Sequence, residues 1–304
     1  MISIIYHKNC LDGLMAAYLT TKYLALQYNG DFSDQAYKLF PMHYGDPIPE
    51  EVINDSDELY IVDFSFPPEV LVTISNIPKI VMLDHHESAA KKYGGYGHYI
   101  IQYDTTLEGA NVLFEKEHSG CGLVLKYLIR DESLIDPLEL GIAKAIEDRD
   151  LWKFTLPETK TICMVMDGLD KTVDAWDKFF KTTTDSQFYD LVEEADIKIK
   201  FSNNISESIA AKATMIKFQG YDIPVVNTSI NISEVGNILA GKYNLSMSFF
   251  ILTQSQEVVI SMRSKSEEFD VSKLCSVYSG GGHLCAAGFK IPLSLLPDLL
   301  SSKL

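Results

Sequence analysis

Short apolar runs that end in polar residues recur along the first part of the chain. The runs at residues 2–6, 59–62 and 80–83 carry no charged side chain, which is typical of strands buried in a parallel sheet. The second run is followed directly by Asp63, and the third by Asp84. Because ligands bind beyond the carboxyl ends of strands in open α/β sheets, this pattern predicts an α/β domain with a polar site at one edge.

Helical periodicity accompanies these strands. Apolar spacing predicts helices over residues 14–27, 122–129 and 138–146, and the last of them gives way to acidic residues. From residue 185 to 218 the sequence contains neither Pro nor Gly and favours a helix. We therefore expect a connecting helix in this part of the chain.

A second set of strands is predicted after that helix. Strand-like runs at residues 223–226, 247–252 and 257–262 surround a helical stretch at 234–243, and a glycine-rich turn follows at 280–282. At 304 residues the chain exceeds what one hydrophobic core usually serves, so a second, smaller α/β domain is expected. The predicted parts are a first domain at residues 1–185, a linker helix at 186–218 and a second domain at 219–304.

The charge balance limits the class of partner. Lys and Arg number 26 against 42 Asp and Glu, which gives a formal net charge of -16. Proteins that track long duplexes usually carry a basic stripe, and the sequence shows none. Bound divalent cations can nevertheless dominate the local field, so a small phosphate ester is compatible with this charge and long duplex nucleic acid is not expected.

The cysteines and the N-terminus indicate the compartment. Five cysteines form no C-x-x-C pair, so reduced thiols are expected rather than a disulfide framework or a structural zinc site. The N-terminus lacks a signal-peptide pattern, and no apolar run approaches roughly 18 residues. We expect a cytoplasmic protein without a membrane partner, and the sequence is compatible with a homodimer.

Four polar clusters carry the candidate chemistry. They are His7-Lys8-Asn9-Cys10-Leu11-Asp12-Gly13, Val62-Asp63-Phe64-Ser65, Asp84-His85-His86 and Glu147-Asp148-Arg149-Asp150. Each combines His or Asp with the end of a predicted strand or helix, and hard divalent ions such as Mn²⁺ prefer carboxylate and imidazole ligands. Any one cluster alone is a weak signal, but four in this order predict a metal site.

In order and spacing these clusters resemble motifs I to IV of the DHH phosphoesterases. That family includes RecJ-type exonucleases, nanoRNases, cyclic-dinucleotide phosphodiesterases and family II pyrophosphatases. The segment from Tyr278 to Phe289 is similar to the GGGH signature of the associated DHHA1 domain. The resemblance covers nearly the whole chain and favours the branch that cleaves phosphodiesters over the pyrophosphatases.

The resemblance implies a metal-binding role for six residues. Asp63 would bridge two ions, His7 would bind one of them, and Asp12, His85 and Asp148 would bind the other. Asp150 in place of Asp148 is an open alternative. Cys10 stands where the commonest family pattern has Asp, and it is either a thiolate ligand or a residue that fills space. The ions implied are two Mn²⁺, with Mg²⁺, Zn²⁺ or Fe²⁺ as alternatives.

Further residues are expected to support catalysis or to bind substrate. Asp84, His86 and Asp150 would be catalytic or supporting groups, because a ligating imidazole usually donates its other nitrogen to a carboxylate. Arg263 resembles the DHHA1 arginine that grips a substrate phosphate. The turn formed by Gly280, Gly281, Gly282 and His283 would let backbone N–H groups approach a phosphate.

The resemblance implies a metal-dependent phosphodiesterase with its active site in a cleft between the domains. Short oligonucleotides, hydrolysed to nucleoside monophosphates, are the expected substrates. The alternatives are cyclic or linear dinucleotides, polyphosphate, and a catalytically inactive nucleotide-binding module, which the departure at Cys10 keeps open.

Other residues are expected to be structural. Trp152 and Phe154 are predicted to lie in the core. Ser119-Gly120 is interpreted as the N-cap of the following helix. His43, His98 and His118 show no partner pattern, so no catalytic role is expected for them.

Overall fold

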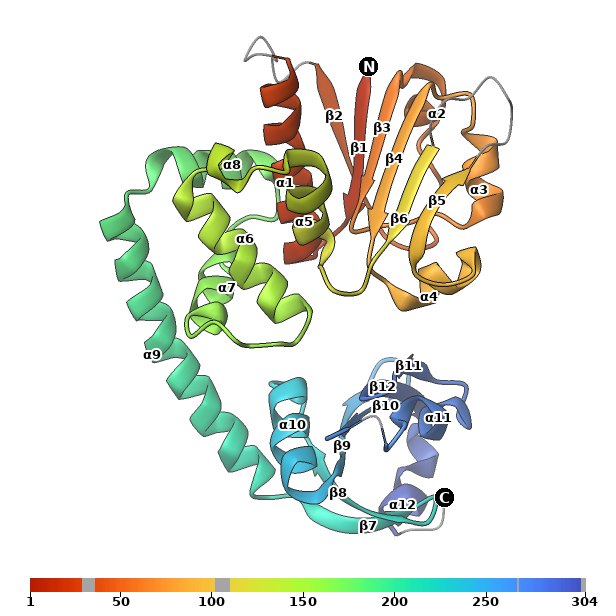
Figure 1. Ribbon diagram of the computed structural model, residues 1–304. Helices are drawn as coiled ribbons and strands as arrows, with labels where there is room; N and C mark the ends of the chain where they lie inside the picture. The colour runs from red at the N-terminus through yellow and green to blue at the C-terminus, as the bar shows by residue number, and fades with distance from the viewer. Residues whose placement is uncertain (29–35, 102–109, 267, 302–304) are drawn as a thin grey trace. The chain divides into compact units, whose positions relative to one another are not determined.

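Figure 1 presents the computed structural model, which describes residues 1–28, 36–101, 110–266 and 268–301. The chain divides into two compact units, Met1–Asp196 and Ile197–Leu304. Each unit contains its own six-stranded sheet and its own hydrophobic core. The prediction of a parallel-sheet α/β domain followed by a smaller α/β domain is therefore confirmed.

The first unit is built on a mostly parallel sheet. Its strands are β1 (Ile2–His7), β2 (Tyr37–Met42), β3 (Glu58–Val62), β4 (Lys79–Asp84), β5 (Gly97–Ile101) and β6 (Ala110–Phe114). They lie in the order β2-β1-β3-β4-β6-β5. Neighbouring strands are parallel, except that the edge strand β5 runs antiparallel to β6.

Helices cover both faces of this sheet. They are α1 (Leu11–Gln27), α2 (Glu50–Asp55), α3 (Pro68–Thr73), α4 (Glu87–Ala90), α5 (Gly120–Leu123), α6 (Pro137–Asp150), α7 (Thr159–Asp167) and α8 (Val173–Thr182), with short 3-10 segments at Lys91–Tyr93 and Glu132–Leu134. A π-helical segment, Val124–Ile129, continues from α5.

Alternate side chains of each strand enter different cores. Ile4 and Tyr6 of β1 belong to the core that α1, α5 and α6 cover, whereas Ile5 belongs to the core under α2 and α3. Figure 1 shows these two groups of helices on opposite sides of the sheet. Because both faces are covered, the strands are apolar throughout, as the uninterrupted runs predicted.

The helix α6 begins and ends at residues that its sequence specifies. Asp136 is the N-cap and accepts a hydrogen bond from the N–H of Leu138 at 2.8 Å, and Pro137 fits the first helical position. The helix ends at Asp150, and Trp152 then takes a positive φ of 54°. The turn follows directly after Asp148 and Asp150, the two aspartates of the fourth motif.

A long helix occupies most of the predicted linker. It is α9 (Asp185–Ala210), and the division between the two units falls within it. The first strand of the second sheet, β7 (Thr214–Phe218), also lies inside the range predicted as linker. None of the helices in the described ranges is long and apolar enough to span a lipid bilayer.

The second unit has a mostly antiparallel sheet. Its further strands are β8 (Tyr221–Asn227), β9 (Leu245–Leu252), β10 (Glu257–Ser264), β11 (Gly281–His283) and β12 (Ala286–Pro292), in the order β11-β12-β10-β9-β8-β7. Only β8 and β9 pair in parallel within this sheet. Its helices are α10 (Ile232–Tyr243), α11 (Val271–Ser276) and α12 (Leu296–Leu300), with a 3-10 turn at Leu293–Leu295.

Period-two alternation also organises the second core. Val258, Ile260 and Met262 of β10 are buried against α11, while Val226 of β8 packs on α10. Polar or half-exposed residues alternate with them along β10. This arrangement leaves Arg263 near the end of β10, next to β12.

Candidate metal centre

The carboxyl ends of three parallel strands carry the first candidate residues. The registers of β1 with β3 and of β3 with β4 align His7, Asp63 and Asp84 at the same edge of the sheet. The N–H of Asp63 still donates to the carbonyl of Leu83 at 3.0 Å, so the ladder holds this edge together. The sequence pattern of apolar runs ending in His or Asp therefore translates into one cluster.

Asp63 lies at the centre of this cluster. Its Oδ1 is 3.2 Å from Nε2 of His85, and its Oδ2 is 3.7 Å from Nδ1 of His7. Oδ2 is buried and has no hydrogen-bond partner within the described part of the chain. Burial opposes ionisation, but the two imidazoles outweigh it and hold the pKa of Asp63 below its usual range. A buried, ionised oxygen without a donor fits contact with a cation.

Asp12, in the first turn of α1, is fixed by the start of α5. Its Oδ1 accepts from the hydroxyl of Ser119 at 2.7 Å and from the N–H of Cys121 at 2.9 Å. Its Oδ2 accepts from the N–H of Gly120 at 2.6 Å. A Cβ on Gly120 would lie only 2.3 Å from the Cβ of Asp63, so glycine is needed there. Ser119 is indeed the N-cap residue, but its hydroxyl bonds Asp12 instead of capping α5.

Cys10 is the N-cap residue of α1 and lies next to His7. Its Sγ, a ring nitrogen of His7 and a carboxylate oxygen of Asp63 lie within 4.8 Å of one another. Burial and the neighbouring Asp63 raise the pKa of the thiol well above its usual range. The position suits a ligand, and a bound cation is what would favour the thiolate there.

Asp84 organises the two histidines that follow it. Its Oδ1 accepts from the N–H of His85 at 2.8 Å and is 2.7 Å from Nδ1 of His86. The contact with Nδ1 leaves Nε2 of His86 for other partners, while His85 turns its Nε2 toward Asp63. Asp84 thus has the geometry of an orienting carboxylate, and Asp84 Oδ2 has no hydrogen-bond partner in the described residues.

Asp150, the last residue of α6, joins the cluster. Its Oδ2 lies 3.3 Å from Nε2 of His85. Asp12, His85 and Asp150 together present ligand atoms within 4.8 Å of one another. Asp150 therefore lies with Asp12 and His85, the group in which Asp148 was the first expected ligand and Asp150 the alternative.

Asp148 is bonded to the loop that follows α6. Its Oδ1 accepts from the N–H and the hydroxyl of Thr155 at 2.9 and 2.6 Å, and its Oδ2 accepts from the N–H of Leu156 at 3.1 Å. The hydroxyl of Thr159 also donates to Oδ2. These donors hold the pKa of Asp148 below its usual range against the effect of burial. With both oxygens engaged, Asp148 is not among the residues that the structure brings together.

Three overlapping groups of side chains could hold cations. They are Asp63 with Asp84, His85 and His86; His7 with Cys10 and Asp63; and Asp12 with His85 and Asp150. Asp63 is in contact with members of each group. Carboxylates and imidazoles in this combination suit divalent metal ions.

The cluster carries more negative than positive charge. Burial, and then Asp63, raises the pKa of Asp12 above its usual range, and burial also raises the pKa of Asp150. Burial alone would lower the pKa of His85, but the hydrogen bond to Asp63 and the nearby carboxylates raise it to about 10. A proton on His85 balances part of this charge, and a bound divalent cation would replace it.

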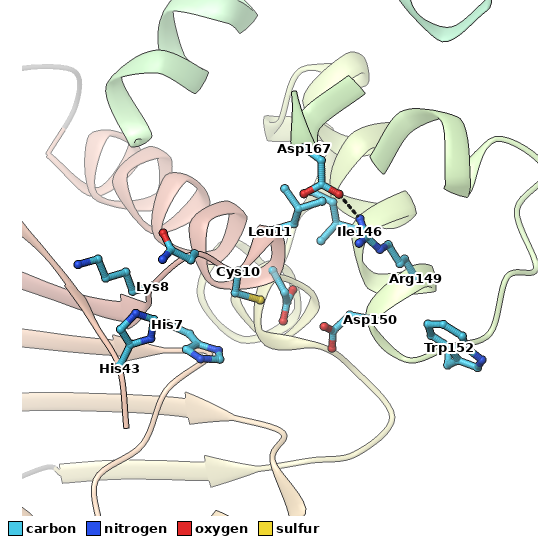
Figure 2. A pocket seen from close by; sticks show the side chains of 12 residues that line it. His7, Lys8, Cys10, Leu11, His43, Ile146, Arg149, Asp150, Trp152 and Asp167 are labelled. Carbon is cyan, nitrogen blue, oxygen red and sulfur yellow. Dashed lines mark hydrogen bonds and ion pairs between the residues drawn. The ribbon is translucent and has the colours of Figure 1, made fainter. Parts of the chain in front are cut away.

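A cavity of about 520 Å³ opens beside the cluster (Figure 2). Its lining consists of His7, Lys8, Asn9, Cys10, Leu11, Asp12, His43, Ile146, Arg149, Asp150, Trp152 and Asp167. Sites for small molecules usually enclose roughly 300–1,000 Å³. Nη1 of Arg149 donates to Asp167 at 2.6 Å, the contact drawn as a dashed line in Figure 2. The size and polarity suit a ligand of nucleotide dimensions.

Three aromatic residues at this site differ from the sequence-based view. Trp152, expected in the core, is 59% exposed, and Phe154 is only half-buried. Both take positive φ, which turns the chain outward after α6. Tyr44, which sequence reasoning missed, stacks on Phe64 with centroids 4.6 Å apart and lies 5.6 Å from the ring of His7. It stands in a loop between β2 and α2, where no motif marks it.

Arg263 in the second unit is half-buried and engaged within its own domain. Its Nη2 donates to the hydroxyl of Ser233 at 2.9 Å, and its Nη1 donates to the carbonyl of Met262 at 2.9 Å. Gly236 on α10 allows this, because a Cβ there would lie 2.8 Å from Cγ of Arg263. Ser233, in the first turn of α10, is therefore a partner of Arg263.

The glycine turn, residues 280–283, lies along β12. A Cβ on Gly280 would meet the carbonyl of Gly288 at 2.3 Å, and Gly282 has a φ of 145° that favours glycine. Gly281 and His283 are exposed at either end of the short strand β11. Because β11, β12 and β10 are neighbours, the turn and Arg263 belong to one end of the same sheet.

Comparison with known proteins supports this architecture. Residues 224–302 match the sequence profile of the DHHA1 domain. The matched residues lie within the second unit. The whole chain also resembles in fold the pGpG-specific phosphodiesterase PggH from Vibrio cholerae, with a TM-score of 0.59 and 13% identity, covering 98% of this chain and 96% of that one. The fold of the chain is thus similar to that of PggH, and its C-terminal part matches the DHHA1 model, as the resemblance implied.

Two further proteins are similar to this chain. An exopolyphosphatase-related protein from Bacteroides fragilis has a TM-score of 0.52 and 16% identity, over 95% of this chain and 86% of that one. An uncharacterised protein of Acanthamoeba polyphaga mimivirus is 23% identical over 94% of this chain. The chain spans 66% of the length of that viral relative.

Proposed function

We propose that this protein is a metal-dependent phosphodiesterase that hydrolyses short oligonucleotides to nucleoside monophosphates. The observation that carries the proposal is the buried Oδ2 of Asp63, which has no hydrogen-bond partner in the described ranges and lies among the ligand atoms of His7 and Cys10. Its other oxygen faces His85. A carboxylate with one oxygen toward each of two ligand groups suits a bridge between two ions.

The proposed ligands are His7, Cys10 and Asp63 for one ion and Asp12, His85, Asp150 and Asp63 for the other. Asp148, first proposed as a ligand, is replaced by Asp150 because its oxygens are bonded to the loop after α6. Mn²⁺ is the proposed metal, since oxygen and imidazole donors dominate, and Zn²⁺ or Fe²⁺ becomes more suitable if Cys10 binds as thiolate. Two such ions, when bound, would supply an activated water and would stabilise charge on a phosphoryl group.

The side chains around this position would orient the substrate and move protons. Asp84 holds Nδ1 of His86, so Nε2 of His86 is the atom that can donate to a phosphate or a leaving oxygen. Burial lowers the pKa of His86, but Asp84 outweighs it and raises the pKa, which favours a proton on this ring. Arg263 and residues 280–283 are proposed to bind a substrate phosphate.

A short substrate is favoured by charge and by cavity size. The net charge of -16 disfavours binding of a long polyanionic strand, and the cavity of about 520 Å³ has nucleotide dimensions. PggH, which shares the fold, is specific for the dinucleotide pGpG. Linear dinucleotides are therefore included in the proposed substrate class, and cyclic dinucleotides and polyphosphate are the enzymatic alternatives.

A substrate panel tests the proposal. The protein with Mn²⁺ is incubated with di- to decanucleotides, cyclic dinucleotides and polyphosphate, and initial rates and products are measured. We expect nucleoside monophosphates, with rates that fall as the chain grows beyond a few residues. A chelator should abolish turnover, and Asp63→Asn should reduce kcat/KM by at least about 1,000-fold, since metal catalysis supplies several kcal/mol.

The same substrate panel distinguishes the proposed function from its alternatives. Turnover of polyphosphate alone would identify a different activity. Nucleotide binding without turnover, and without Mn²⁺ bound, would identify an inactive binding module. Undiminished hydrolysis by a highly purified Asp63→Asn protein would refute the two-metal site itself.

A further inference from the structure

Trp152 is a large aromatic side chain exposed beside the most polar site of the chain. It is 59% exposed and lines the same cavity as Cys10 and Asp150. Figure 2 shows the carboxylate of Asp150 between the Cys10 thiol and the indole. An exposed indole at the wall of a polar cavity is unusual unless it meets a ligand, because Trp usually buries most of its surface.

The backbone that presents this indole is strained and specifically held. Trp152 and Phe154 have φ values of 54° and 48°, a region that bulky residues rarely adopt. The carbonyl of Asp148 accepts from the N–H of Lys153 at 2.9 Å, and its carboxylate accepts from the N–H of Thr155 at 2.9 Å. The role left to Asp148 after its exclusion from the metal cluster is therefore to hold this turn.

The orientation of the indole is also supported by packing. The ring of Phe154 lies 4.9 Å from that of Trp152 at an interplanar angle of 82°. Nζ of Lys160 lies 5.2 Å from the centroid of the Phe154 ring. In this T-shaped contact the two rings do not stack face to face.

Arg149, a cation in the lining of this cavity, is already engaged. Nη1 of Arg149 is bonded to Asp167, which is also bonded to Lys171. The guanidinium is therefore held in an ion pair, and Trp152 remains as the aromatic surface that this wall offers to a ligand.

We propose that Trp152 is the platform on which a nucleobase of the substrate stacks while the adjoining phosphodiester lies at the metal cluster. The inference rests on the proposed function and narrows its substrate class to esters that carry a base next to the scissile phosphate. Stacking on an aromatic face tolerates every base, so it selects for nucleotides without reading their sequence. Polyphosphate has no group for this platform.

Intrinsic fluorescence offers a direct test with the unmodified fold. The chain has two tryptophans, and the other, Trp176, is fully buried, so a ligand-dependent change reports on Trp152. With Mn²⁺ present, guanosine 5′-monophosphate should quench the emission and ribose 5-phosphate, which lacks a base, should not. Trp152→Phe should abolish the quenching. Equal quenching by both ligands, or quenching that persists in Trp152→Phe, would overturn the proposal.

Kinetics of variants provide the second test. A dinucleotide is compared with the same diester carrying an abasic sugar, and kcat and KM are measured for each. We expect the wild type to favour the base by roughly 5- to 100-fold, the range that base–aromatic stacking gives. In Trp152→Ala this preference for the base should be lost, and the loss should appear in KM. Trp152→Phe should retain most of the preference.

A matched control and two contrary outcomes complete the design. Tyr189 on α9 is 62% exposed and is not part of the cavity lining, so Tyr189→Ala should behave as the wild type. An equal loss on both substrates in Trp152→Ala would indicate a purely structural role and refute the platform. Failure of the wild type to hydrolyse either diester would instead refute the proposed function, whereas base-dependent quenching in that case would still support the platform.

Discussion

The metal cluster and the Arg263 region are built in opposite ways. In the cluster, Asp63 and Asp84 each bury a carboxylate oxygen that finds no hydrogen-bond partner in the described structure. Arg263 instead donates to Ser233 and Met262 of its own domain. Burying an unpaired acceptor is costly, whereas a bonded guanidinium is stable as it stands. The first region therefore suits a cation that would compensate its buried carboxylates, whereas the hydrogen bonds of Arg263 are complete without one.

The pair Asp150 and Asp148 gives the largest expected effect within the first region. Asp150→Asn should weaken Mn²⁺ binding by about 100-fold, because a ligand beside His85 is lost. Asp148→Asn should leave metal stoichiometry intact but lower the free energy of unfolding by roughly 1–3 kcal/mol, since donors of the loop lose an acceptor. Metal titration and thermal unfolding of both variants measure the two effects. If Asp148→Asn instead loses metal affinity and Asp150→Asn loses only stability, Asp148 is the ligand.

Arg263→Ala tests the second region. Hydrogen bonds to charged groups contribute about 1.5–3 kcal/mol, so KM for a dinucleotide should rise by roughly 10- to 100-fold while Mn²⁺ affinity stays unchanged. Lys290→Ala on β12 is the matched control, because Lys290 is an exposed cation that contacts Glu257 at 3.4 Å. An equal effect of both variants would point to general electrostatics rather than a phosphate contact.

The pH dependence of metal binding sharpens the contrast. The pKa of His85 is raised to about 10 without a metal, so at neutral pH its ring carries a proton that must leave before it can bind an ion. Metal affinity should therefore fall as pH falls, by about tenfold per unit for one proton between roughly pH 7 and 9. Calorimetric titration in buffers of different ionisation heat counts the protons released. A pH-independent affinity would contradict the assignment of His85 as a ligand.

Cys10 gives the smallest expected effect. We expect Cys10→Ser to weaken the ion on the His7 side by about tenfold, and Cys10→Asp to restore Mn²⁺ binding at that side, because a hard ion prefers oxygen. Metal titration with elemental analysis measures both. Unchanged binding in Cys10→Ser would show that the thiol only fills space, and a single tightly bound ion in every variant would refute the role proposed for His7.

The sequence predicted the strand-end residues better than the helix-end residues. Apolar runs that stop at Asp63 and Asp84 define both the parallel strands and the edge at which their ends meet, so the cluster follows from the pattern. Asp148 and Asp150 stand two residues apart on α6, where side chains point in very different directions. Which of them faces the sheet depends on how the helix packs, and the local sequence does not state that.

The residues around the cluster were predicted from the sequence less well than the cluster itself. Trp152 was expected in the core because large aromatic residues are usually buried, but the positive φ after α6 turns it outward. Tyr44 reaches His7 from a loop that carries no motif. Ser119 was interpreted as an N-cap, and only the tertiary fold reveals that its hydroxyl donates a hydrogen bond to Asp12. Each of these depends on a backbone turn or on a contact between distant segments.

The left-handed backbone of Asp63 bears on the stability of the metal cluster. Its φ of 51° lies in a region where a residue with a side chain is strained by an amount of order 1–3 kcal/mol. Replacement by glycine would relieve that strain, but it would also remove the carboxylate that faces His7 and His85. The backbone strain therefore adds to the cost of the buried oxygen without a hydrogen-bond partner among the described residues, and a bound cation would offset both.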